Sequence, residues 1–175
     1  MSTFKVSGTV VLLLLGATAM SQESPGLGEP VSAEHIAAID NTVLPNGDGL
    51  PAGSGTARDG AMVYQQHCLA CHGEGGTDGI NDRLVGGHGS MTSERPVKTV
   101  GSFWPYATTV FDYVRRSMPL TTPGVLSDDE TYAVTAYLLY LNEIVGEDDQ
   151  IDANTLPEVK MPNRDNFVWD YSPMP

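Results

Sequence analysis

Residues 67 to 72 read HCLACH, and Cys68 and Cys71 are the only two cysteines in the chain. Two residues separate them, and His72 follows the second cysteine directly. This arrangement suits three kinds of chemistry. The pair could ligate zinc, form a redox-active disulfide, or hold a haem by covalent bonds.

The first two kinds of chemistry lack supporting residues. A zinc knuckle needs a second pair of ligands, but His67 and His72 flank the cysteines too closely to complete a tetrahedron, which leaves His88 alone. A redox-active pair usually sits at a helix N-terminus, which lowers the pKa of the first thiol. Here the pair lies toward the end of its expected helix, and no βαβ pattern surrounds it.

The third kind of chemistry accounts for every residue of the motif. C-x-x-C-H is the attachment signature of a c-type haem. Cysteines about one helical turn apart can meet the two vinyl groups of a haem as thioethers, and the next residue can then reach the iron. We therefore expect one covalent haem c, bound by Cys68 and Cys71, with His72 as the proximal iron ligand. His67 lies on the wrong side of Cys68 and has no expected role.

The sixth iron ligand is expected to be a methionine or a histidine, of which methionine gives the higher reduction potential. Met118 stands next to Pro119, which ends a helix, and so lies on a rigid and reachable loop. We favour Met118 as the distal ligand over Met91, over His88 and over an open position. The other methionines lie in the leader, on the His72 helix or in the tail: Met1, Met20, Met62, Met161 and Met174.

An iron with both axial positions filled suits outer-sphere electron transfer rather than substrate chemistry. No grouping of acid, base and nucleophile stands out elsewhere in the sequence. We therefore expect no enzymatic activity from this chain by itself.

Helices and loops must position these residues, and the sequence predicts no strand of appreciable length. A helix capped by Asp59 runs to His72, with Met62, Val63 and Tyr64 on its inner face. A glycine-rich stretch, 73–101, follows without clear periodicity; a loop of this length needs something to organise it, such as a large apolar cofactor.

Two further helices are predicted after this loop. The first covers 105–118, with its apolar residues at helical spacing. The second begins at Ser127, which forms a capping box with Glu130, and continues to about residue 145.

The ends of the chain predict export and flanking extensions. Residues 1–21 have the layout of a cleaved signal peptide, which predicts a periplasmic protein that is not inserted in the membrane after cleavage. An extended arm, 22–56, precedes the haem domain, 57–145, and an acidic, proline-rich tail, 146–175, follows it. The net charge of −13 argues against nucleic-acid binding and favours docking on a basic protein face.

The segments GAMVYQQHCLACHGEGG, SMP and LSDDETYAVTAYLLYLNEI resemble class I cytochrome c. The resemblance implies an all-α fold in which an N-terminal helix packs across a C-terminal helix. Gly60 and Tyr64 would then lie near Tyr137 and Leu138.

A more specific resemblance lies in the segments LPNGDGLPAGSGTARDG, VGSFWPYATTVFDYVRRSMPL and LPEVKMPNRDNF. These look like the cytochrome subunit of Sox-type sulfane dehydrogenase and of related sulfite dehydrogenases. The resemblance implies an electron-accepting subunit that partners a periplasmic molybdenum-containing dehydrogenase subunit in sulfur oxidation. Electrons would then pass to a downstream cytochrome c or a terminal oxidase.

The sequence departs from some members of that family, because it has one haem motif where they have two. A free periplasmic electron carrier is an alternative, and a haem sensor or ligand-binding protein with a labile sixth ligand is a second. Within the segment 104–116, Trp104 and Tyr106 could donate hydrogen bonds to haem propionates. Arg115 and Arg116 could do the same or face a partner.

Overall fold

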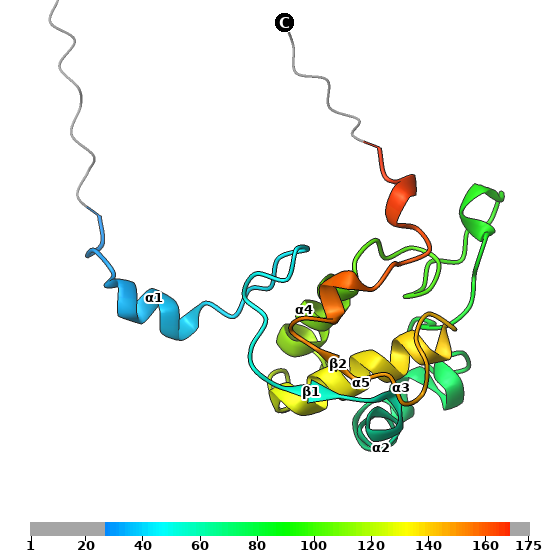
Figure 1. Ribbon diagram of the computed structural model, residues 1–175, viewed down its shortest axis with the longest axis horizontal. Coiled ribbons are helices and arrows are strands. Elements are labelled where there is room, and N and C mark those ends of the chain that lie inside the picture. The colour runs from blue at the N-terminus through cyan, green and yellow to red at the C-terminus, as the bar shows by residue number, and fades with distance from the viewer. Residues whose placement is uncertain (1–26, 169–175) are drawn as a thin grey trace, which may run out of the picture. The chain divides into compact units, whose positions relative to one another are not determined.

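The computed structural model describes residues 27–168 (Figure 1). The chain divides into two compact units between Ala37 and Ala38. The expected signal peptide, 1–21, lies outside the described residues, as does the end of the tail, 169–175. Among the described residues, no helix is both long and apolar enough to cross a bilayer.

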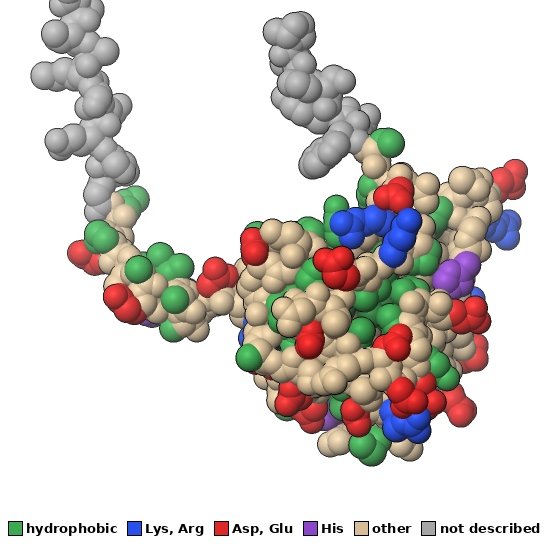
Figure 2. Space-filling view, in the orientation of Figure 1, with side chains coloured by type: hydrophobic (Ala, Val, Ile, Leu, Met, Phe, Trp, Pro, Cys, Tyr) green, Lys and Arg blue, Asp and Glu red, His purple; other side chains and the backbone are tan. Residues whose placement is uncertain are grey.

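The short helix α1, Ala33–Ile39, is preceded by Ser32, whose hydroxyl accepts a hydrogen bond from the His35 amide. None of its residues is buried. Ile36 and Ile39 are exposed, and hydrophobic side chains are visible over this helix in Figure 2.

The second unit is built on three longer helices and one short one. Helix α2, Ala57–His67, is followed directly by the single turn α3, Leu69–His72. Helices α4, Ala107–Ser117, and α5, Asp128–Leu141, come later in the chain and pack against each other. Figure 1 shows α2 almost end-on against α5, which runs across the view. This arrangement confirms the expected all-α, class I cytochrome c fold.

The crossing of α2 and α5 depends on a glycine. A Cβ atom added at Gly60 would lie 1.9 Å from the carbonyl oxygen of Ala133 and 2.8 Å from the Tyr137 Cβ. One turn further along α2, the ring of buried Tyr64 lies 5.3 Å from that of Tyr137. The helix backbones can approach this closely only because residue 60 has no side chain.

We expect Gly60→Ala to lower the free energy of unfolding by about 2 kcal/mol or more. The new methyl group would meet the main chain of α5, which cannot rotate away, and such overpacking outweighs the better helix propensity of alanine. Chemical denaturation of the purified protein measures the change. Met62→Ala, at a 69% exposed position of the same helix, should change the free energy by less than about 0.5 kcal/mol. Equal effects of the two substitutions would contradict this view of the crossing.

The start of α2 differs from the sequence-based expectation in two ways. Thr56 is the N-cap, because its hydroxyl accepts the Asp59 amide, whereas Asp59 lies within the first turn. Met62 points outward, so the inner face of α2 consists of Ala57, Gly60 and Tyr64, with Val63 partly buried.

Helices α4 and α5 form the centre of the core. The rings of Phe111 in α4 and Tyr132 in α5 are fully buried and lie 4.4 Å apart. The predicted capping box is present at the start of α5, since the Ser127 hydroxyl accepts the Glu130 amide and the Glu130 carboxylate accepts the Ser127 amide.

Both flanking segments pack onto these helices. The strand β1, Ser54–Gly55, pairs antiparallel with β2, Ile151–Asp152. In the arm, Val43 is buried, and its amide donates to the Asp112 carboxylate over 2.9 Å. In the tail, Leu156 and Met161 are fully buried. The arm from Val43 and the tail to Met161 thus complete the core around α4 and α5.

The buried carboxylate of Asp112 joins the arm to α4. Burial alone would raise its pKa, but the hydrogen bonds from Arg116 and from the Val43 amide outweigh this effect, so the pKa is lowered. A carboxylate with a lowered folded-state pKa stabilises the fold above its unfolded-state pKa, and this contribution disappears as the pH falls through the folded-state value.

We therefore expect Asp112→Asn to unfold more easily at neutral pH and to lose less stability on acidification than the wild type. Denaturation midpoints measured between about pH 2 and pH 7 test this. Asp165→Asn serves as a control, because the exposed Asp165 contacts Lys160 only at 4.0 Å. If the stability of Asp112→Asn depended on pH in the same way as that of the wild type, the proposed contribution of the Asp112 carboxylate to stability would be refuted.

Candidate haem-binding site

Cys68 lies at the junction of α2 and α3, where it is both the C-cap of α2 and the N-cap of α3. Its carbonyl accepts the amides of Cys71 and His72 over 3.1 and 3.0 Å, so the three motif residues follow one turn of helix. Both thiols are unpaired and half-buried. The spacing of one turn is the one that attachment to a haem requires.

Burial, followed by the neighbouring Cys71, raises the pKa of the Cys68 thiol to about 11. A redox-active C-x-x-C pair needs the opposite shift, because the thiolate is the attacking species. Within residues 27–168, no cluster of three or more His, Cys, Asp or Glu side chains could hold a metal ion. Haem iron does not need such a cluster, because the porphyrin supplies four ligands and the protein only the axial ones.

The His72 ring is oriented by the main chain. Its Nδ1 atom lies 2.9 Å from the carbonyl oxygen of Asp82. A carbonyl can only accept, so Nδ1 carries the proton and the lone pair is on Nε2. Metal-binding histidines are commonly held in this way, with one ring nitrogen donating to a carbonyl and the other free for the metal. The geometry of His72 therefore fits a haem iron.

The loop after His72 is ordered in large part by its own main chain. The Asn81 amide donates to the Cys71 carbonyl over 2.9 Å, and the Leu84 amide donates to the Gly76 carbonyl over 2.8 Å. Gly79 lies so close that an added Cβ would be 2.1 Å from the Cys71 carbonyl oxygen. The sequence predicts that something must organise this stretch, such as a large apolar cofactor, and backbone hydrogen bonds and close glycine contacts provide much of its order.

Met118 directly follows α4, and its amide donates to the Val114 carbonyl over 3.0 Å. Its side chain is partly buried against the hydrophobic core. The predicted distal ligand is thus attached to a fixed helix end. Its role as the distal iron ligand stays a prediction.

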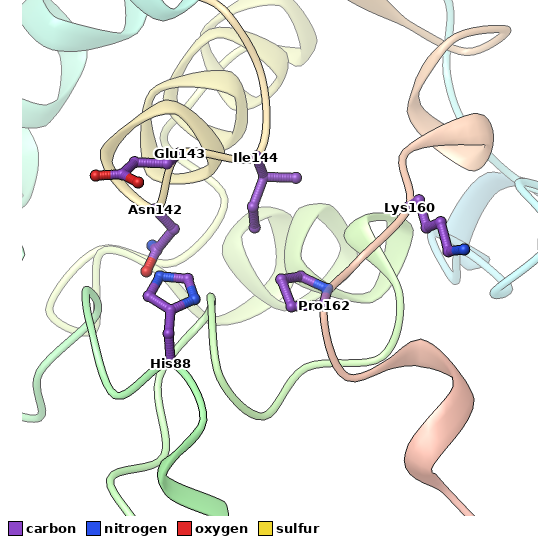
Figure 3. A pocket seen from close by; sticks show the side chains of 6 residues that line it. All are labelled: His88, Asn142, Glu143, Ile144, Lys160 and Pro162. Atoms are coloured by element: carbon purple, nitrogen blue, oxygen red, sulfur yellow. The ribbon is translucent and has the colours of Figure 1, made fainter.

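The alternative sixth ligands lie elsewhere. Met91 and His88 line an open cavity of about 680 Å³ together with tail residues that include Asn163 and Phe167. His88 also lines a smaller cavity of about 300 Å³, shown in Figure 3. Cys68, Cys71, His72 and Met118 line neither cavity.

The aromatic and basic residues before Met118 are used within the fold. Arg115 pairs with Asp128 at 3.1 Å and also reaches the Asn41 carbonyl, and Arg116 pairs with Asp112. Trp104 packs edge-on against Tyr113, and the Tyr106 ring lies beneath Arg164. Arg115 therefore joins α4 to the start of α5 and to the arm, whereas Arg116 pairs within α4; a contact of either with a propionate or a partner stays a prediction.

Comparison with known proteins places this chain in a family. A model of the family described as cytochrome c oxidase, cbb3-type, subunit III, matches residues 55–138. A solved structure, the sulfane dehydrogenase SoxCD from Paracoccus pantotrophus, is 44% identical with a TM-score of 0.77. The match covers 84% of this chain and 73% of the other. The chain belongs to the class I c-type cytochromes. No protein with a curated description matches the sequence.

The cytochrome assignment makes haem c the cofactor of this family and electron transfer its general role. In the cytochrome, Asp82 and Tyr64 support the motif in ways that the sequence does not reveal. The Asp82 carbonyl orients His72, and the Tyr64 hydroxyl donates to the Gly73 carbonyl over 2.8 Å. Both contacts use backbone carbonyls, which are present at every position and therefore leave no sequence signal.

Proposed function

We propose that this cytochrome is the electron-accepting subunit of a periplasmic, molybdenum-dependent dehydrogenase of sulfane or sulfite compounds. It would carry one haem, attached through thioethers to Cys68 and Cys71, with His72 and Met118 as the iron ligands. When bound, the haem supplies a one-electron iron couple. The observation that carries the proposal is the 44% identity to the sulfane dehydrogenase SoxCD over 84% of this chain.

The residues of the chain suit a permanent electron-transfer site. The thioether bonds would prevent loss of the cofactor outside the cell. The Asp82 carbonyl holds His72 in the tautomer with Nε2 available, and Met118 at the fixed end of α4 would fill the remaining position. With both positions filled, little reorganisation accompanies electron transfer, and small molecules are kept from the iron.

The flanking segments support a subunit rather than a diffusing carrier. The end of the arm is fixed to the helical core, since the Tyr132 hydroxyl donates to the Pro51 carbonyl over 2.9 Å and the Ser54 amide donates to Asp129 over 2.8 Å. Acidic side chains outnumber basic ones by 22 to 9. Figure 2 shows the acidic side chains spread over the visible face. A strongly acidic protein associates readily with a basic surface of a partner.

Co-purification tests the partnership. The cytochrome, expressed with a tag in its native host, should elute with a molybdenum-containing chain at physiological salt. Addition of sulfite or a sulfane substrate should then reduce the haem of the isolated complex. Elution of the cytochrome alone, together with reduction by several unrelated donors, would instead support a free electron carrier.

A further inference from the structure

Asn142 follows α5 directly, is only 2% exposed, and directs its amide at main-chain groups of α5 and of an earlier loop. Its Nδ2 donates to the carbonyls of Leu84 and Leu138 over 3.1 and 2.8 Å. Its Oδ1 accepts the Gly86 amide over 3.1 Å. One buried side chain thus attaches the end of α5 to both Leu84 and Gly86.

The segment that Asn142 holds is the one that orients His72. Asp82, whose carbonyl accepts the His72 Nδ1 proton, lies only two residues before Leu84. Leu84 is held further by two backbone hydrogen bonds. Its amide donates to the Gly76 carbonyl, and its carbonyl accepts the Val100 amide over 3.2 Å. The span 82–86 is therefore fixed to the histidine at one end and to Asn142 at the other.

The surroundings of Asn142 leave its amide little room to move. A Cβ atom added at Gly101 would lie 2.3 Å from Asn142 Oδ1 and 2.8 Å from His88 Cε1, so all three residues are in close contact. Figure 3 shows the Asn142 side chain extending from the end of α5 toward His88. Because Asn142 is almost fully buried, each of its hydrogen bonds is costly to break.

We propose that Asn142 is a positioning residue for the axial histidine: by clamping residues 84–86, it holds the Asp82 carbonyl against His72 Nδ1. The proposal rests on the ligation by His72 proposed above. A firm Nδ1–H···O=C bond raises the basicity of an imidazole ligand and fixes its ring. Loosening that bond makes the histidine a weaker electron donor to ferric iron and raises the reduction potential.

Two variants of Asn142 and one matched control test the proposal. Asn142→Ala removes all three hydrogen bonds. Asn142→Ser keeps a polar side chain, but this side chain is too short to reach both Leu84 and Gly86. Asn163→Ala is the control, since Asn163 is also buried and also donates to a backbone carbonyl, that of Phe103, over 2.9 Å. Exchange of the His72 Nδ1 proton is followed by NMR in the reduced holoprotein, together with the midpoint potential.

Both Asn142 variants should exchange this proton at least about tenfold faster than the wild type, as expected for the loss of at least one buried hydrogen bond. Their potentials should be higher than those of the wild type and of Asn163→Ala. Exchange within twofold of the control, with unchanged potentials, would overturn the proposal. If His72 in the wild type lacked the NMR shifts of an iron ligand, the ligation itself would be wrong.

A measurement on the wild type covers variants that fail to fold. Native-state exchange in low denaturant should give the His72 Nδ1 proton and the Gly86 amide the same opening free energy, because both belong to the clamped segment. Independent opening of the two groups would refute the clamp.

Discussion

Replacement of both Cys68 and Cys71 with alanine is expected to abolish covalent haem attachment. The two thiols are unpaired and lie one helical turn apart, and they are the only cysteines in the chain. Without them, no side chain can form a thioether, and any associated haem would be released on denaturation. The mass of the denatured protein and haem staining of a denaturing gel measure the change.

The histidines that flank the cysteines provide a matched comparison. His67→Ala should retain one covalent haem per chain with an unchanged spectrum, because His67 ends α2 on the far side of Cys68. His72→Ala should lose the proximal ligand and with it the normal spectrum of a six-coordinate cytochrome. A double cysteine variant that still carried haem after denaturation would contradict the proposed attachment.

Substitution of Met118 by alanine is expected to remove the near-infrared sulfur-to-iron band of the oxidised protein and to lower its reduction potential. Methionine stabilises the reduced iron relative to water or histidine, and axial ligands together span about 0.8 V in haem proteins. We expect a decrease on the order of 0.1 V or more. Optical spectra and redox titration of the holoprotein measure both effects.

Met91→Ala is the control for this substitution, because Met91 lines the cavity beside Phe103 and Phe167 rather than the haem motif. It should change neither the band nor the potential. Loss of the band in Met91→Ala instead would transfer the ligand role to that residue. A wild-type protein without the band would favour a haem sensor with a labile sixth ligand.

The sequence predicted much of the helical frame because its signals are local. The motif itself places Cys68, Cys71 and His72 on one turn. The apolar spacing in α4 and the capping box at Ser127 each lie within a few residues, and both are confirmed. The class I cytochrome c fold is confirmed as well, including the close approach of Gly60 and Tyr64 to Tyr137.

Features that depend on distant segments could not be predicted. Strand β1 pairs with a strand almost one hundred residues later, and each strand has only two residues, too few to form a pattern. The tail is acidic and rich in proline, yet it buries Leu156 and Met161. The N-cap was assigned to Asp59 rather than Thr56 because both residue types cap helices, and only the backbone geometry decides between them.

Asn142 was also missed, for a related reason. It comes at the end of an apolar helix, where asparagine commonly occurs simply as a helix-terminating residue. Its partners are backbone groups of Leu84 and Gly86, more than fifty residues earlier. Only the folded structure shows that this side chain joins α5 to the segment that orients His72.

The most direct test of the proposed electron-accepting role is rapid-mixing spectroscopy of the purified oxidised cytochrome with its co-purified molybdenum-containing partner. On addition of sulfite or a sulfane compound, one haem per chain should be reduced at a rate compatible with turnover. No reduction should occur when the partner is omitted. Absence of reduction in the complete mixture, or equally fast reduction by unrelated donors, would contradict the proposed role.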